Sequence, residues 1–228
     1  EEGKQPKVPG SPEFVHCFKL ILTIRIKIQI QITIIIKLKS NKVTQSQVEA
    51  ETEDQCEKVR TNLIPYAERD CNDDMNNEVT KIVGTSDDKM PNTLYDIHIK
   101  LVIEIRLKLE IAIINLEQAK IALSTASEDE EAECARKVDE CQAEVEDLQA
   151  QYDYEMSICI TLKLIISIQV KIKALQQTVA NSQSNAPPTS ILSVPADKAA
   201  SANQIQLAAL IKIQIELYLK LVVVLGVP

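Results

Sequence analysis

Cysteine is the residue type in this 228-residue chain whose number and placement most directly suggest chemistry. The chain has six cysteines, and an even number is typical of disulfide-bonded proteins from an oxidising compartment. The sequence therefore predicts three disulfides and a secreted protein, with six unpaired thiols in a reducing compartment as the alternative. The predicted disulfide residues are Cys17, Cys56, Cys71, Cys134, Cys141 and Cys159.

The spacing of the cysteines limits how they can pair. Cys134 and Cys141 lie on one predicted helix, about 10.5 Å apart along its axis, which is too far for a bond between them. Cys56 and Cys71 lie on either side of Pro65 in a second helical segment. We therefore expect one of these two to pair with each of Cys134 and Cys141, which would staple the two helical segments together.

The remaining cysteines, Cys17 and Cys159, each open a predicted strand on its polar face and form the expected third pair. A zinc site is the other common use of cysteine and histidine, and His16 stands beside Cys17. However, the chain has only two histidines and no closely spaced pair of cysteines. The sequence predicts neither a metal site nor a cofactor.

Motifs for hydrolysis or phosphate binding are missing from the sequence. There is no Gly-x-Ser-x-Gly elbow and no glycine-rich phosphate loop. His98 falls inside a predicted strand, where we expect it to be solvated on the polar face. The acids from Glu128 to Glu131 are most simply a solvated helix start, because their spacing does not match a calcium loop. The sequence predicts a protein that is not an enzyme.

The element that dominates the sequence is the stretch from Phe18 to Lys39, FKLILTIRIKIQIQITIIIKLK. Its even positions are all apolar as far as Leu38, whereas most of its odd positions are polar. Side chains in a strand alternate between two faces, so this period of two predicts a long amphipathic β-strand. The alternation recurs along the chain, and the four predicted strands cover residues 15–39, 96–114, 157–174 and 204–228.

The segments between the strands have a different character. Residues 40–95 are acidic with helical spacing, and we expect Pro65 to separate two helices and Gly84 to end the second one. Residues 1–14 are predicted to be a flexible or vector-derived N-terminus. Residues 175–203, rich in Ser, Asn, Ala and Pro, are predicted to be a linker.

Residues 115–156 form the second predicted helical segment. Ser127 is the expected N-cap, with Glu130 behind it in the first turn. An apolar seam then recurs at spacings of three and four, as in a coiled coil, and predicts packing on another helix rather than on a sheet. The seam consists of Cys134, Val138, Cys141, Val145, Leu148, Tyr152 and Met156.

Together these elements predict an α+β fold, in which four very long amphipathic strands form a sheet or sandwich with disulfide-stapled acidic helical inserts. The net charge of −8 divides between segments, with about +9 on the strands and about −17 elsewhere. The sheet would present one aliphatic face for assembly. Its central residues would be Ile24, Ile26, Ile28, Ile30, Ile32, Ile103, Ile105, Ile166, Ile168, Ile213 and Ile215.

Such a face is too large to stay exposed to water, so the molecule that covers it indicates the function. The first hypothesis is a secreted, non-enzymatic structural protein whose strands assemble with other copies into fibres or layered sheets. The second is a lipid-binding or membrane-inserting, pore-forming β protein, and a closed intrachain sandwich is the third possibility. The predicted partner is the chain itself, with lipid as the alternative. Nucleic acid is excluded, because the basic rows lack aromatic residues for stacking.

Overall fold

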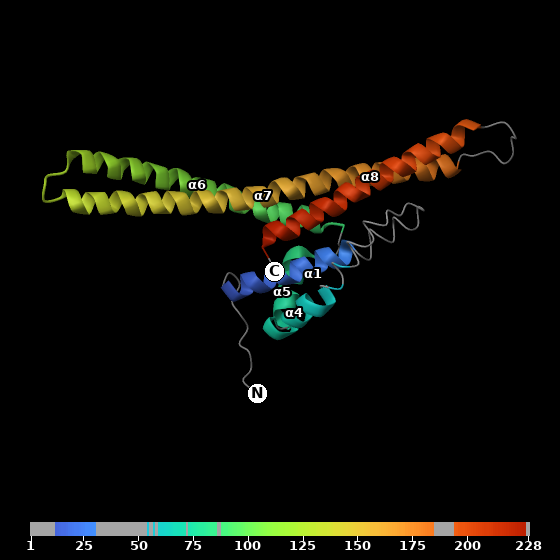
Figure 1. Ribbon diagram of the computed structural model, residues 1–228, viewed down its shortest axis with the longest axis horizontal. Helices are drawn as coiled ribbons and strands as arrows, with labels where there is room; N and C mark the ends of the chain where they lie inside the picture. The colour runs from blue at the N-terminus through green and yellow to red at the C-terminus, as the bar shows by residue number, and fades with distance from the viewer. Residues whose placement is uncertain are drawn as a thin grey trace. The chain divides into compact units, whose positions relative to one another are not determined.

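The computed structural model describes residues 12–30, 54, 57, 59–71, 73–85, 88–184 and 194–226, and none of them lies in a β-strand. The predicted α+β fold with four long strands is therefore wrong, because the described chain is helical (Figure 1). The elements are α1 (Pro12–Gln29), the short π-helix η2 (Val59–Leu63), α4 (Ile64–Asp70), α5 (Asp73–Val83), α6 (Met90–Thr125), α7 (Glu131–Ser184) and α8 (Val194–Leu225).

Each predicted strand coincides with part of a helix where the structure describes it. Residues 15–29 lie in α1, and residues 31–39 lie outside the described part. The second and third predicted strands lie in α6 and α7, and the fourth lies in α8 as far as Leu225. In the described residues the alternating pattern therefore belongs to helices with 3.6 residues per turn, and the predicted period of two is wrong.

The predicted terminal segment and linker also change. Pro12 to Phe14 belong to α1, and Phe14 is buried, so the chain before residue 15 contributes to the core. The predicted linker is helical at both ends, in α7 as far as Ser184 and in α8 from Val194, with residues 185–193 outside the described part.

An alternating sequence is compatible with a helix for a geometric reason. At 3.6 residues per turn, residues two apart lie about 200° apart, so neighbouring members of an alternating series fall on opposite sides of a helix. Each further pair is displaced by about 40°, and a long series therefore spreads its aliphatic side chains around the helix. Lys, Arg, Glu, Gln and Leu are good helix formers, and isoleucine costs only a few tenths of a kcal/mol. Ion pairs four residues apart add support on α6, where Lys108 contacts Glu104 at 2.9 Å and Arg106 contacts Glu110 at 3.2 Å.

The chain divides into two compact units, residues 1–93 with 161–228 and residues 94–160. In the first unit α1 contacts η2, α4, α5 and α8. Leu20, Ile21, Leu22 and Thr23 are consecutive buried residues of α1, so this helix is covered on several sides. A helix that is apolar around most of its circumference is stable in such a position, which explains why the described part of the most regular alternating stretch is helical.

The first unit also contains the second half of α7 together with α8. Gln169 of α7 donates a hydrogen bond from Nε2 to Oη of Tyr218 on α8, at 3.1 Å. Buried residues recur along α8 at spacings of four and three, which is the pattern of helix-on-helix packing. These residues are Leu207, Ile211, Gln214, Tyr218, Leu221 and Leu225.

The second unit is a hairpin of residues 94–125 of α6 and 131–160 of α7, which run side by side in opposite directions (Figure 1). Its core contains Leu116 and Ala119 of α6 against Cys141 of α7. Val138 and Val145 pack against this cluster. The coiled-coil seam predicted for residues 134–156 is confirmed at these positions, and its partner is a helix, as expected.

The predicted helix end at Gly84 is confirmed, whereas the expected N-cap Ser127 lies four residues before the first residue of α7. Ser127 donates from its backbone N–H and from Oγ to Oε2 of Glu130, at 3.3 and 2.7 Å, and α7 follows at Glu131. Gly84, with φ of 83°, ends α5 and donates its N–H to the Thr80 carbonyl at 2.8 Å. Pro65 lies in the first turn of α4, which follows η2, so the larger break comes later, at Cys71.

Candidate functional site

The side of α6 opposite its buried side carries a row of exposed aliphatic residues, which we call the outer row. Its members are each between 53% and 64% exposed. Their spacings of four, four, three and seven keep them along one side of the helix. The outer row consists of Ile103, Leu107, Ile111, Ile114 and Ile121.

The buried side of α6 follows the same rhythm, and we call it the inner seam. Its residues are at most 8% exposed and recur at spacings of seven, three, four and three. Leu109, Ala112 and Ala119 of the seam each have an outer-row residue two positions further on, about 200° around the helix. The helix is therefore apolar on two opposite sides. The inner seam consists of Val102, Leu109, Ala112, Leu116 and Ala119.

The two helices of the hairpin differ strongly in charge. Residues 94–125 hold four acidic and four basic side chains, so this part of α6 is neutral. Residues 131–160 hold nine acidic and two basic side chains, which gives this part of α7 a net charge of −7. The exposed aliphatic row thus lies on a neutral helix that is paired with a strongly acidic one.

The described residues of the expected assembly face lie on four helices, α1, α6, α7 and α8, and not on strands of one sheet. Of the ten expected residues that the structure describes, only Ile28, Ile103 and Ile213 are exposed. Ile26, Ile30 and Ile215 are buried, and Ile32 lies outside the described part. The other members, which are half-buried, are Ile24, Ile105, Ile166 and Ile168.

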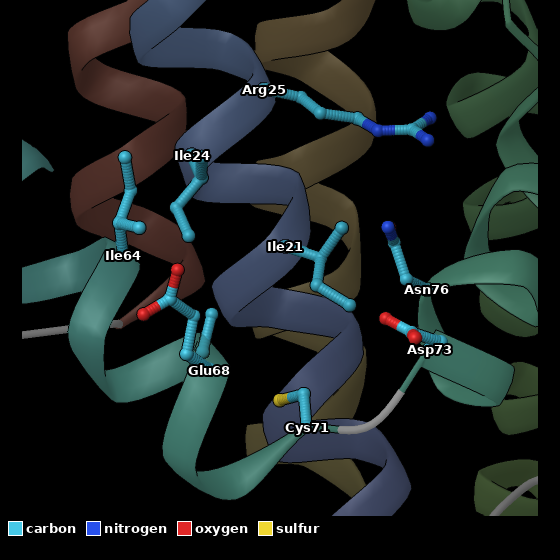
Figure 2. A pocket seen from close by; sticks show the side chains of 9 residues that line it. Ile21, Ile24, Arg25, Ile64, Glu68, Cys71, Asp73 and Asn76 are labelled. Atoms are coloured by element: carbon cyan, nitrogen blue, oxygen red, sulfur yellow. The ribbon is translucent and has the colours of Figure 1, made fainter.

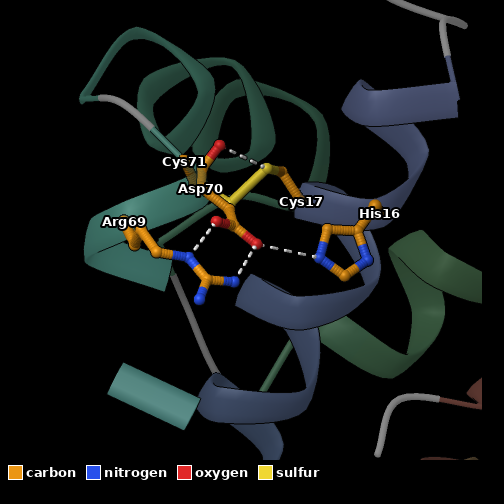
Figure 3. Close-up of polar contacts among 5 residues, drawn as sticks. All are labelled: His16, Cys17, Arg69, Asp70 and Cys71. Atoms are coloured by element: carbon orange, nitrogen blue, oxygen red, sulfur yellow. Dashed lines mark hydrogen bonds and ion pairs between the residues drawn. A yellow bond between two sulfur atoms is a disulfide. The ribbon is translucent and has the colours of Figure 1, made fainter. Parts of the chain in front are cut away.

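The disulfide that the structure contains joins Cys17 of α1 to Cys71, which directly follows α4 (Figure 3). Their Cα atoms are 5.8 Å apart, and Cys17 Sγ lies 3.4 Å from the carbonyl oxygen of Asp70. The Asp70 carboxylate accepts hydrogen bonds from Arg69 at 2.6 and 3.0 Å and lies 3.7 Å from Nε2 of His16. His16 therefore contacts a carboxylate in this structure.

The predicted disulfide connectivity is not the one observed. Cys17 pairs with Cys71 instead of Cys159, because the helical α1 places it against the end of α4. Cys134, Cys141 and Cys159 are free thiols of α7, so they do not staple the helical segments together. Cys56 lies outside the described residues.

A cavity of about 260 Å³ lies between α1, α4 and the start of α5 (Figure 2). Ile21, Ile24 and Ile64 line one part of it, and Glu68 and Asp73 line another. The Arg25 guanidinium at its edge already donates to the Gly84 carbonyl at 3.0 Å and to the Thr80 hydroxyl. The cavity is smaller than most small-molecule sites, and its one cation is engaged, so it gives no basis for assigning a ligand.

His98 is placed differently from the sequence prediction. It is buried in the hairpin, where its Nδ1 contacts Oε2 of Glu155, and their side chains are only 10% and 15% exposed. Cys159 follows one turn after Glu155 on α7 and is also buried. Burial, with a smaller contribution from the Glu155 charge, raises the pKa of the Cys159 thiol to about 11. Cys159 is therefore protonated at neutral pH and is a poor nucleophile.

No group of three or more His, Cys, Asp and Glu side chains in the described part is arranged to hold a metal ion. Within the same residues, no helix is both long enough and apolar enough to span a membrane. Comparison of the chain with protein families, with curated proteins and with solved structures finds no match.

The sequence interpretation missed most of the outer row, although a signal for it was present. Between Leu94 and Leu123 of α6, apolar residues and His98 recur at spacings of four, four, three, four, three, four, three and four. This rhythm runs beyond Ile113, where the alternation ends. A longer window would therefore have favoured a helix and revealed the outer row as its second side.

Proposed function

We propose that this chain is a non-enzymatic protein that associates with itself through its long helices. The proposal depends on one observation, which is the exposed outer row of α6 on the side opposite the inner seam. A hairpin in which each helix has one apolar side buries both of these sides within itself, so it needs no further partner. A helix that is apolar on two opposite sides is suited to packing between two neighbours, of which α7 is one.

The size of the outer row indicates the strength of the association. Full burial of a leucine or isoleucine side chain contributes about 1.5–3 kcal/mol, so each half-exposed residue can contribute about 1 kcal/mol. Five residues from each of two copies give about 10 kcal/mol, which is similar to the cost of about 4–15 kcal/mol for bringing two molecules together. At the low end of this cost about 6 kcal/mol remains, so the expected complex is weak, with a dissociation constant of tens of micromolar or above.

An oxidising compartment is part of the proposal and is supported by the Cys17–Cys71 disulfide. Alkylation of the unfolded chain without reductant, followed by mass spectrometry of its peptides, would test this in protein purified from its natural source. Peptides with Cys134, Cys141 and Cys159 should carry the label, whereas those with Cys17 and Cys71 should stay linked. Labelling of Cys17 and Cys71 would argue for a reducing compartment.

Sedimentation velocity of the full chain, from about 1 to about 200 µM, tests the proposed self-association. We expect the weight-average sedimentation coefficient to rise with concentration in buffer without lipid or detergent. A coefficient that stays at the monomer value over this range would contradict the proposal.

A further inference from the structure

We infer that the partner of the outer row is the outer row of a second copy, so that two hairpins pack with their α6 helices together and their α7 helices outside. This inference rests on the proposed self-association and specifies the surface that carries it. Each copy offers the same five residues, so the contact is between identical surfaces.

The form of the outer row favours a helix as its partner. The row is narrow, because its residues follow one side of α6 at helical spacing, and Gln118 fills the position between Ile114 and Ile121. Ion pairs of Glu104 with Lys108 and of Arg106 with Glu110 lie on α6 beside it. Between two helices these charges would remain at a solvated rim, whereas insertion into lipid would desolvate them.

Charge determines which helix of a second copy can approach. The neutral α6 meets no net repulsion from another α6. The net charge of −7 on residues 131–160 of α7 repels the same surface of a second copy and would attract a basic partner instead. The apolar row and the acidic surface lie on different helices, so the arrangement that buries the row and separates the acidic surfaces is α6 against α6.

The first test replaces Leu107, Ile111 and Ile114 by glutamine in one variant, Leu107→Gln, Ile111→Gln, Ile114→Gln. Each of these side chains is more than half exposed, so the fold of the single chain should survive. The matched control is Ile160→Gln, Val170→Gln, Ile205→Gln, which changes residues of similar exposure, at 55%, 63% and 67%, outside the outer row. Far-UV circular dichroism checks the helix content of both variants.

In sedimentation velocity we expect the outer-row variant to raise the dissociation constant at least about tenfold and the control to change it less than about twofold. If the unchanged chain associates and the outer-row variant associates equally well, the inference is wrong while the proposed self-association stands. If the unchanged chain is monomeric, both are wrong. Binding of a monomeric chain to phosphatidylcholine vesicles, lost in the outer-row variant, would identify lipid as the occupant and overturn the inference.

A second test needs no substitution and so does not depend on the fold of a variant. Unlabelled and ¹⁵N-labelled chains are mixed and treated with an amine-reactive cross-linker, and mixed-isotope peptides identify links between copies. We expect links among Lys100, Lys108 and Lys120 of α6, and none between the Lys137 residues of two α7 helices. Mixed-isotope links that join only lysines outside α6 would overturn the inference.

Discussion

At the scale of single residues, the hairpin contains a polar contact in an otherwise apolar seam. His98 occupies a buried position between Leu94 and Val102, and its imidazole contacts the Glu155 carboxylate of α7. A buried imidazole requires a hydrogen-bond partner, because an unpaired one loses its contacts with water without compensation. The pair therefore favours one alignment of α6 against α7, since sliding either helix would separate the two groups.

Replacing the Glu155 carboxylate tests how much its contact with His98 contributes to stability. We expect Glu155→Ala to lower the free energy of unfolding by about 1–3 kcal/mol, because it leaves the buried imidazole without its partner. Urea unfolding followed by circular dichroism measures the change. The control is Glu144→Ala on the exposed side of α7, which should change stability by less than about 0.5 kcal/mol. Equal effects of the two substitutions would contradict the assigned role.

Cys159 allows a prediction about pH. Burial raises its pKa from 9.0 to about 11, so at pH 8 its thiolate fraction should be about 100-fold lower than that of an ordinary cysteine. The folded chain favours the neutral thiol of Cys159 over the thiolate. The resulting contribution to the free energy of unfolding is complete below pH 9 and is lost as the pH rises towards 11.

Iodoacetamide labelling of the native chain, followed by mass spectrometry, tests this prediction. At pH 8 the half-buried Cys134 should react first and Cys159 last, and the rate at Cys159 should keep rising as far as about pH 11. Glu155→Gln should increase the rate at Cys159, because it removes the negative charge that helps to raise the pKa. A rate at Cys159 that levels off near pH 9 would contradict the raised pKa.

At the scale of helices, the Cys17–Cys71 disulfide connects α1 to the end of α4 across 54 residues of sequence. Closing a loop of this length restricts the unfolded chain by about 4 kcal/mol in the chain-entropy estimate. The disulfide therefore ties the central helix of the first unit to a segment of short helices, α4 and α5, which would contribute little stability as isolated helices.

Removing this disulfide should loosen the first unit and leave the hairpin unchanged. We expect Cys17→Ser to destabilise the first unit by about 2–5 kcal/mol. Hydrogen exchange should accelerate in α1, α4 and α5, whereas exchange in residues 104–150 should stay the same. Cys134→Ser, which removes a free thiol, is the control and should leave exchange in the first unit unchanged. Faster exchange across both units in Cys17→Ser would contradict a local effect.

At the scale of helices, part of the fold could be predicted from the sequence alone. The seam through Cys141 and Val145 and the end of α5 at Gly84 were predictable, because each has one physical interpretation. The alternating stretches have two, since aliphatic residues at every second position form one face of a strand or are distributed around a helix. Short windows cannot decide between these structures, because the decision depends on whether partners cover both sides of the helix.

Prediction of the outer row depends on the same choice between a strand period of two and a helix period of 3.6 residues. In a strand the alternating residues of α6 would form one surface, whereas in the helix Leu109 and Leu107 lie on opposite sides. The predicted disulfide is wrong for a related reason. The strand interpretation pairs Cys17 with Cys159, because each opens a predicted strand, whereas the helical α1 brings Cys17 to Cys71.

At the scale of the whole molecule, the alternating helices differ in how their second side is covered. In the first unit α1 is surrounded by other helices, and in the hairpin the outer row of α6 is exposed. If a second copy covers that row, folding and association are linked, because a partner that binds only the folded chain stabilises it by mass action.

Thermal unfolding should therefore depend on protein concentration. We expect the Tm of the full chain to rise by a few degrees between about 2 and about 200 µM, because a larger share of the folded chain is then paired. The Tm of the outer-row variant, Leu107→Gln, Ile111→Gln, Ile114→Gln, should not change over the same range of concentration. The Tm of the control, with changes at Ile160, Val170 and Ile205, should rise as in the unchanged chain. A concentration-independent Tm for the unchanged chain would mean that the outer row has no partner copy, and the exposed side of α6 would then need another explanation.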